Sequence, residues 1–182
     1  MTLEKLASQG HHSTQGSMAA GIGIRIREIR KTFIKESFSD FQEAEHRLEK
    51  IANVHGIEFI NDSKATNVNS TWFALESMTK PVIWIAGGVD TGNDFRILCG
   101  LIRKSVKAII CIGVDNDNLI AAIRETDVPF LTTQSMTEAV ELAYLAGIKG
   151  DVVLLSPACA SFDLFIDYED RGNEFKKAVK NL

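Results

Sequence analysis

The sequence predicts an α/β fold of the Rossmann-like kind, in which a mainly parallel sheet is covered by helices on both faces. Three runs of strand length consist mostly of Val, Ile, Leu and other apolar residues, at residues 81–86, 107–112 and 151–155. Segments with helical periodicity separate these runs. Strands that are buried on both faces are continuously apolar, so this pattern favours a parallel sheet between two layers of helices.

The expected elements follow one another along the chain. A short helical segment precedes the sheet and begins at Ser17, which is suited to be its N-cap, and a second short helix fits residues 31–38. Two alternating runs around His55-Gly56 predict a β-hairpin over residues 48–62. The later helices are expected at 67–78, 94–103, 116–125, 136–146 and 170–180, and the later strands at 81–86, 107–112, 129–132 and 151–155.

Size and composition limit the classes of function. The chain has 182 residues, 45% of them hydrophobic, which is enough for one domain with a core and a short appendage. Its net charge of -4 argues against nucleic acid and against an anionic membrane surface as partners. The three cysteines form no CxxC pair, and the four histidines show no zinc-ligand spacing. No apolar run is long enough to span a bilayer, and no signal-peptide pattern opens the chain. We therefore expect a cytoplasmic protein without a metal site and without membrane insertion.

The most polar strand end is the segment 61–67, Asn-Asp-Ser-Lys-Ala-Thr-Asn. In α/β sheets the ligand crevice lies at the carboxyl ends of the strands, so this segment is a candidate contact for a nucleotide or phosphate. Lys64 would supply positive charge, and Thr66 or Asn67 would cap the next helix. The alternative is a helix cap with a solvated ion pair between Asp62 and Lys64, since residues two apart on an extended segment share a face.

The segment 156–163, Ser-Pro-Ala-Cys-Ala-Ser-Phe-Asp, follows the last strand. Small residues there allow a ligand to approach the backbone, whose N–H groups can hold a carboxylate or phosphate. Cys159 is either a nucleophile or a small buried filler, and the lack of an identifiable histidine partner favours the filler. The turn 87–90 carries two glycines, which suit a tight turn near a ligand but are common in such turns.

Two nucleotide-binding patterns are absent from the sequence. No G-x-x-x-x-G-K-[ST] phosphate loop occurs. Gly21 and Gly23 lie in a helical pattern without a third glycine at the right offset, so they do not form a dinucleotide fingerprint. His11-His12 fits a polar loop better than a metal site.

Taken together, the motifs resemble those of the Mur ligase family, and within it the ligases that add D-glutamate. The resemblance is carried by His46-Arg47, the segments 61–67 and 156–163, Phe165, Tyr168, and Arg-Gly-Asn-Glu-Phe at 171–175. It covers residues 44–182 as the C-terminal domain of such a ligase. Residues 1–43 would be a remnant of the closing helices of the central ATPase domain, on a match that begins at residue 10 and rests on Ser17-Met18-Ala19-Ala20.

The resemblance implies that the chain is part of a longer parent enzyme with a UDP-sugar domain and a central ATPase domain. The parent would be an ATP-dependent, amide-forming ligase of peptidoglycan precursor synthesis, which uses ATP and Mg²⁺ to join D-glutamate to UDP-N-acetylmuramoyl-L-alanine. This chain alone is expected to be inactive and to bind no cofactor. The alternatives are another Mur or folylpolyglutamate-type ligase domain, or a stand-alone Rossmann-like binding module.

The resemblance also implies roles for particular residues. Arg47, Asp62 and Lys64 would face ATP, and Arg47 and Lys64 would stabilise charge on the transferring phosphoryl group as catalytic residues. Hydroxyl and backbone N–H groups near D-glutamate would bind its carboxylates. The positions matched to the D-glutamate site are Thr66, Ser161, Phe162 and Tyr168.

The sequence departs from the family pattern in two places. The stretch His12-Ser13-Thr14-Gln15-Gly16 stands where the family commonly has two asparagines near the adenine. Thr91 stands where the family commonly has a lysine that pairs with the side-chain carboxylate of D-glutamate. A lost charged partner for a carboxylate costs about 1.5–3 kcal/mol if nothing replaces it. Thr91 is thus the fifth position matched to the D-glutamate site, and the one at which the sequence departs from the family.

Overall fold

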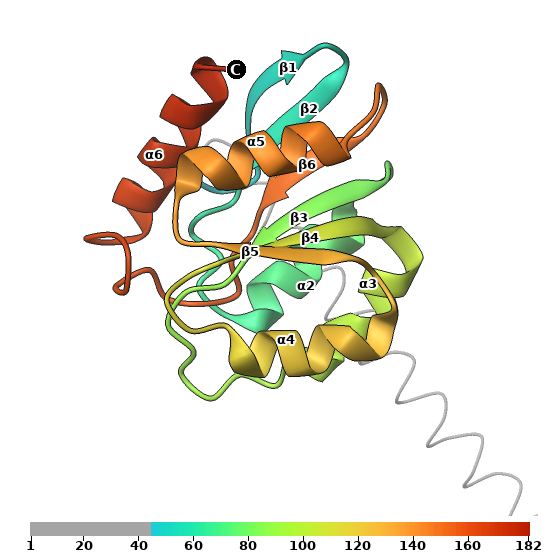
Figure 1. The fold of residues 1–182 in the computed structure, drawn as a ribbon, viewed down its shortest axis with the longest axis vertical. Helices are drawn as coiled ribbons and strands as arrows, with labels where there is room; N and C mark the ends of the chain where they lie inside the picture. The colour runs from blue at the N-terminus through green and yellow to red at the C-terminus, as the bar shows by residue number, and fades with distance from the viewer. Residues whose placement is uncertain (1–44) are drawn as a thin grey trace, which may run out of the picture. The chain divides into compact units, whose positions relative to one another are not determined.

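The computed structural model describes residues 45–182, and these residues form an α/β domain around a six-stranded sheet (Figure 1). The expectations for residues 1–43, which include the Ser17 helix and the stretch 12–16, lie outside the described residues. The sheet order is β1-β2-β6-β3-β4-β5, and only β1 and β2 are antiparallel. The strands are β1 Glu49–Val54, β2 Ile57–Asn61, β3 Val82–Ala86, β4 Val106–Ile112, β5 Phe130–Thr133 and β6 Val152–Leu155. The predicted fold class is confirmed.

Helices cover both faces of the sheet, because alternate residues of the buried strands point to opposite sides. Trp84 of β3 belongs to one apolar cluster, whereas its neighbours Ile83 and Ile85 belong to the other. The first cluster packs under α2, α3 and α4, and the second under α5 and α6 (Figure 1). The helical elements are α2 Val68–Ser77, η1 Phe95–Leu98, α3 Cys99–Ser105, α4 Asp117–Ile123, η2 Arg124–Thr126, α5 Met136–Ala146 and α6 Tyr168–Lys180.

The elements predicted within residues 45–182 all occur, with shifts at their ends. The hairpin turn is His55-Gly56, where both residues have positive φ, as a tight two-residue turn requires. The helix expected at 94–103 begins as the 3₁₀ turn η1 and continues as α3. Helix α6 begins at 168 instead of 170, because the Asp167 side chain accepts a hydrogen bond from the N–H of Asp170 at 2.7 Å and caps it there.

The order of the strands places a crevice at the carboxyl ends of β3 and β6. The chain runs from β3 outward through β4 to β5, then returns to β6, which lies between β2 and β3. The connection after β3 leads to η1 and α3 on one face, and the connection after β6 leads to α6 on the other. Ligands of open α/β sheets bind where the direction of the connections reverses in this way.

Candidate functional site

The segment 61–67 turns sharply after β2 instead of remaining extended. Asp62 is only 4% exposed, and its carboxylate accepts hydrogen bonds from Ser156 Oγ at 2.7 Å and from the N–H of Leu48 at 3.2 Å. Lys64 is exposed, and its Nζ lies 5.7 Å from the centre of the Tyr168 ring. The solvated Asp62–Lys64 ion pair considered from the sequence is therefore wrong, because the two side chains point to different surroundings. The expected helix cap is present at Asn67, whose side chain accepts from the N–H of Ser70.

The carboxyl group of Asp62 is a weaker acid than an ordinary aspartic acid side chain. Burial raises its pKa to about 7, although hydrogen bonds from Ser156 and Leu48 and the nearby charge of Arg47 act in the opposite direction. The site on this side of the sheet therefore holds a carboxyl that changes protonation near neutral pH. Arg47 is half-buried just before β1, close enough to influence Asp62.

The segment 156–163 is bound to the segment 61–67 by several contacts. Ser156 donates to Asp62, and the N–H of Ala158 donates to the carbonyl of Ala65 at 3.0 Å. Cys159 is buried, and burial, reinforced by the charge of Asp90, raises the pKa of its thiol to about 12. The thiol is thus protonated at neutral pH, which confirms the interpretation of Cys159 as a filler.

Ser161 and Phe162, near the end of this segment, have features suited to binding a ligand. The hydroxyl of Ser161 is buried and has no hydrogen-bond partner among residues 45–182. Phe162 is 71% exposed. A buried hydroxyl without a partner is costly, so Ser161 Oγ is available to a ligand that reaches it.

The glycine-rich turn after β3 lies beside the same segment. Gly88 has φ +123°, and a Cβ there would lie 2.2 Å from the carbonyl oxygen of Ala160, so only glycine fits. An isolated bridge joins Val89 to Ala160. Burial opposes ionisation of Asp90, but hydrogen bonds from Asn93 and other groups of the turn outweigh it and hold the pKa of Asp90 below its usual value. Thr91 lies exposed on this turn.

A cavity of about 260 Å³ opens among the loops after β3, β4 and β6. Its lining includes the carboxylates of Asp90, Asp115 and Asp163, but no lysine or arginine. An acidic wall of this kind repels anions. The cavity is therefore not suited to the carboxylates of an amino-acid substrate.

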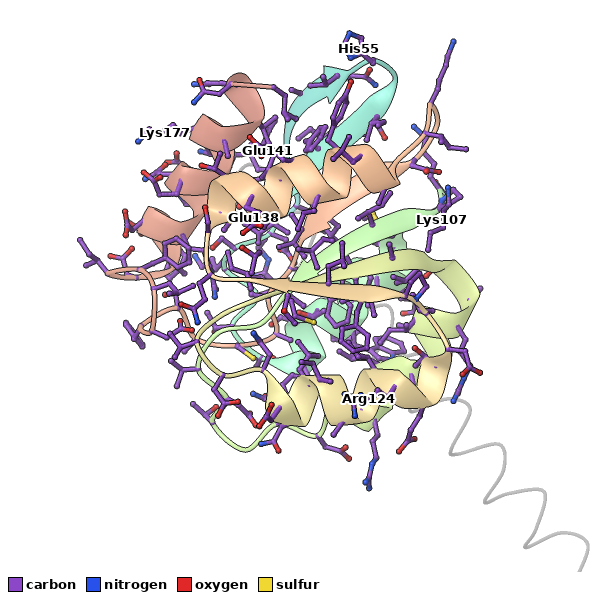
Figure 2. All side chains as sticks on the ribbon, in the orientation of Figure 1. His55, Lys107, Arg124, Glu138, Glu141 and Lys177 are labelled. Carbon is purple, nitrogen blue, oxygen red and sulfur yellow. The ribbon has the colours of Figure 1, made fainter. Side chains whose placement is uncertain are left out.

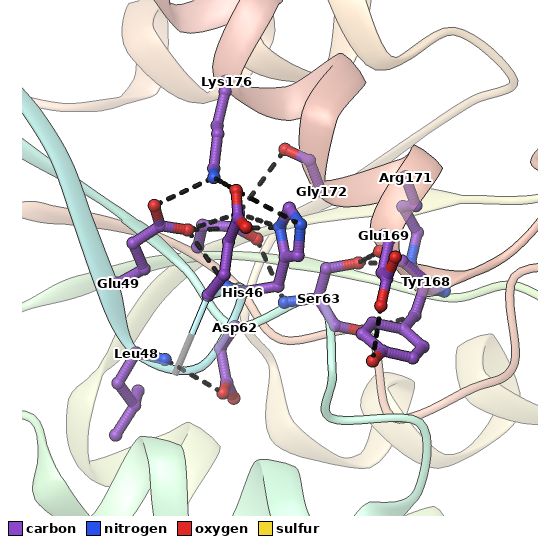
Figure 3. A network of polar contacts seen from close by, with 12 residues as sticks. His46, Leu48, Glu49, Asp62, Ser63, Tyr168, Glu169, Arg171, Gly172 and Lys176 are labelled. Atoms are coloured by element: carbon purple, nitrogen blue, oxygen red, sulfur yellow. Dashed lines mark hydrogen bonds and ion pairs between the residues drawn. The ribbon is translucent and has the colours of Figure 1, made fainter. Parts of the chain in front are cut away.

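A partly buried polar network joins the start of β1 to helix α6 (Figure 3). His46 is buried with φ +61°, and its Nδ1 lies 2.9 Å from Asn61 Nδ2. Lys176 forms ion pairs with Glu45 at 2.7 Å and Glu49 at 2.9 Å. Burial, followed by the charge of Lys176, lowers the pKa of His46, which keeps the ring neutral. The network fixes the backbone next to Arg47.

Arg171 belongs to a motif that carries the family resemblance, but the sequence analysis gave it no role in the site. It is 0% exposed, and it donates from Nε to Ser63 Oγ at 3.0 Å, from Nη2 to the Ser63 carbonyl at 2.8 Å and from Nη1 to the Cys159 carbonyl at 3.1 Å. One signal was present in the sequence. Arg171 shares a helical face with Phe175 and Val179, which are buried, and a charged residue on an apolar face requires an explanation.

The structure brings most of the expected site residues into one region. Arg47, Asp62, Lys64 and Tyr168 surround the end of β2, and Ser161 lies on the segment bound to it. The assignment of these residues to ATP and D-glutamate stays a prediction. Among residues 45–182, no group of three or more His, Cys, Asp or Glu side chains is arranged to hold a metal ion, and no helix there has the length and apolarity needed to cross a membrane.

Comparison with known proteins supports a specific family. The chain is 52% identical over its full length to the UDP-N-acetylmuramoylalanine--D-glutamate ligase of Christiangramia forsetii, and 50% identical to that of Bacteroides thetaiotaomicron. In both cases all of this chain matches 41% of the relative, so the chain spans about two fifths of the length of these curated relatives.

The fold is also found in more distant proteins. The structure of a bifunctional folylpolyglutamate synthase/dihydrofolate synthase from Yersinia pestis, complexed with AMPPNP and a Mn ion, matches with a TM-score of 0.51 and 13% identity. That match covers 77% of this chain and 32% of the other, and it shows a shared fold. The family model described as Mur ligase, glutamate ligase domain, matches residues 46–159. Since this is more than half of the sequence, the chain belongs to the Mur ligase family.

Proposed function

We propose that this chain is the C-terminal, D-glutamate-positioning part of an ATP-dependent ligase that joins D-glutamate to UDP-N-acetylmuramoyl-L-alanine in the cytoplasm. The observation that carries the proposal is the contact between the two strand-end segments. The segment 61–67, proposed to face the nucleotide, is hydrogen-bonded to the segment 156–163, proposed to face the amino acid. The names of the relatives at 50% and 52% identity support D-glutamate as the amino acid.

In the proposed reaction, ATP phosphorylates the carboxylate of UDP-N-acetylmuramoyl-L-alanine. The amine of D-glutamate then attacks the acyl phosphate, which gives an amide, ADP and phosphate. Lys64 and Arg47 would stabilise the negative charge on the transferring group, and Asp62 would hold the turn that presents Lys64. The domain contributes mainly by placing the amine, which is catalysis by proximity. Such ligases use Mg²⁺, whose ligands we place in parts of the parent outside this chain.

The D-glutamate contacts would be made by side chains of the segments 61–67 and 156–163 and by Tyr168, rather than by the acidic lining of the cavity. Ser161 Oγ can donate to a carboxylate because it has no partner among the described residues. Thr66 offers a second hydroxyl, and Phe162 and Tyr168 offer apolar surface. Thr91 would provide at most one neutral hydrogen bond.

The alternative functions are less well supported. The folylpolyglutamate synthase match has 13% identity, against 50% and 52% for the D-glutamate ligases. A stand-alone binding module would not need the exposed charge of Lys64 at the strand end beside Tyr168. We therefore retain D-glutamate ligation as the proposal and treat the chain alone as inactive.

The test uses the full-length parent enzyme. We expect phosphate release that depends on UDP-N-acetylmuramoyl-L-alanine and on D-glutamate, with L-glutamate and D-aspartate as poor substrates. Lys64→Ala should lower kcat by about 10²–10³, as loss of one electrostatic contact at such a site does. Lys104→Ala removes another exposed lysine and serves as the control. Preference for another amino acid, or a normal rate in Lys64→Ala, would refute the proposal or the role of Lys64 respectively.

A further inference from the structure

Arg171 binds two segments that are distant in the sequence. It lies in the first turn of α6, and its guanidinium is completely buried. Two of its nitrogens bind the hydroxyl and the carbonyl of Ser63, and a third binds the carbonyl of Cys159. Ser63 directly precedes Lys64, and Cys159 lies two residues before Ser161. A single side chain therefore holds both segments.

The charge of Arg171 is only partly compensated, because the carboxylate of Asp163 acts on it from beyond ion-pair distance. Among the described residues it forms no ion pair, and its three hydrogen bonds go to neutral oxygens. Burial lowers its pKa to about 10, so it stays charged at neutral pH. Burying a charge without an ion pair costs stability, and an apolar residue of similar size would fill the space without that cost. Packing alone does not explain an arginine at this position.

The contacts of Arg171 extend to a third expected site residue. Ser63 Oγ accepts from Arg171 and donates to the carbonyl of Tyr168 at 2.7 Å (Figure 3). The Tyr168 ring in turn faces Lys64. The planar fork of a guanidinium can bind several oxygens in fixed directions, whereas the ammonium of a lysine cannot reproduce this geometry.

We propose that Arg171 is a positioning residue that sets the distance between the segments 61–67 and 156–163. It acts through Ser63 and Cys159, without contact to either substrate. The assignment of one segment to the nucleotide and of the other to the amino acid rests on the proposed function. The link that Arg171 makes between the two segments does not. Amide formation requires the amine to lie about 3–3.5 Å from the activated carboxyl, so a small displacement of one segment lowers the rate.

The link is tested first in the 182-residue chain by NMR. In Arg171→Lys, the backbone amide signals of both Lys64 and Ser161 should shift, because both segments lose their common anchor. The control is Lys177→Gln, which removes an exposed lysine from the same helix (Figure 2) and should move neither signal. Signals that stay in place in one or both segments of Arg171→Lys would overturn the proposal. If Arg171→Lys does not fold, Ser63→Ala removes one of the three contacts and must shift both signals.

The consequence for turnover is tested in the full-length parent. Arg171→Lys should lower kcat by about 10- to 100-fold, while KM for ATP and for D-glutamate changes less, and Lys177→Gln should match the wild type. A lower melting temperature with unchanged kcat would show a merely structural role. A wild-type rate in Arg171→Lys would show that charge alone suffices, and either result overturns the proposal. A wild-type parent without ligase activity would instead refute the proposed function, and the NMR result would then decide on Arg171.

Discussion

Asp62 shows how one buried side chain makes the stability of the domain depend on pH. Its pKa is raised from 3.8 to about 7 in the folded protein, chiefly by burial. The folded state therefore binds a proton more tightly than the unfolded state does. The stabilisation is complete below about pH 4 and is lost as the pH rises to about 7. At about 1.36 kcal/mol per pKa unit, the contribution is on the order of 4 kcal/mol.

We expect Asp62→Asn to remove this dependence. The free energy of unfolding of the wild type should fall relative to that of Asp62→Asn between about pH 4 and pH 7, and the difference should be constant above pH 8. Urea unfolding of the 182-residue chain at several pH values measures it. The neutral, buried His46 contributes with the opposite sign, because its lowered pKa means that protonation in acid opposes folding, but it is common to both proteins. Parallel stability curves would show that folding does not raise the pKa of Asp62.

Thr91 is the residue at which the proposed amino-acid site differs from the family pattern. It is exposed on the turn beside Ala160, and a threonine offers a carboxylate one neutral hydrogen bond. In the parent, Thr91→Lys should lower KM for D-glutamate about fivefold, since part of the charge-assisted gain is lost to desolvation and ordering of the lysine. The control is Thr91→Gln, because a glutamine side chain approaches that of lysine in length but carries no charge. A KM unchanged within about twofold in Thr91→Lys would place Thr91 outside the site.

At the scale of elements, continuous apolar runs predicted β3, β4 and β6 closely, and alternation predicted the hairpin of β1 and β2. These signals are local, because burial on one or both faces is written into the residues of each strand. The path of the turn at residues 61–67 could not be predicted this way, since it depends on Ser156 and Arg171, which are distant in sequence. For the same reason, the burial of Asp62 and the contacts of Arg171 with both segments depend on the placement of the strands side by side.

The turn between β3 and η1 gives a test of this tertiary constraint. Gly88→Ala should destabilise the chain by about 2 kcal/mol or more, because the new Cβ meets the Ala160 carbonyl at 2.2 Å with φ at +123°. The control is Gly100→Ala in α3, where nothing lies within 4 Å and an alanine should stabilise by about 0.5–1 kcal/mol. Denaturant unfolding compares the two variants. Equal effects would mean that the turn moves freely to accept a side chain.

At the scale of the whole molecule, the described residues supply only part of what the proposed reaction needs. They bring a lysine, an arginine and a hydroxyl to the carboxyl edge of one sheet. The phosphate loop is absent from the sequence, and no metal-binding cluster is present in residues 45–182. Catalysis by proximity requires the remaining groups to be held against this edge. The domain would therefore contribute by binding and placing one reactant. A domain with this role needs to fold as a unit of its own, which can be tested directly.

We expect residues 45–182 to fold without the preceding part of the chain. Residues of this range form an apolar cluster on each face of the sheet, and the ion pair between Glu45 and Lys176 is retained. A protein that begins at Glu45 should therefore unfold in one cooperative transition, with coincident curves from near-UV and far-UV circular dichroism. Its urea midpoint should lie close to that of the 182-residue chain, because the six strands and the helices that cover them are all retained. Neither protein should hydrolyse ATP above background, and activity that Lys64→Ala abolished would contradict this. A broad, non-cooperative transition would show that the sheet requires residues 1–44, and the boundary placed at residues 43 and 44 would then be wrong.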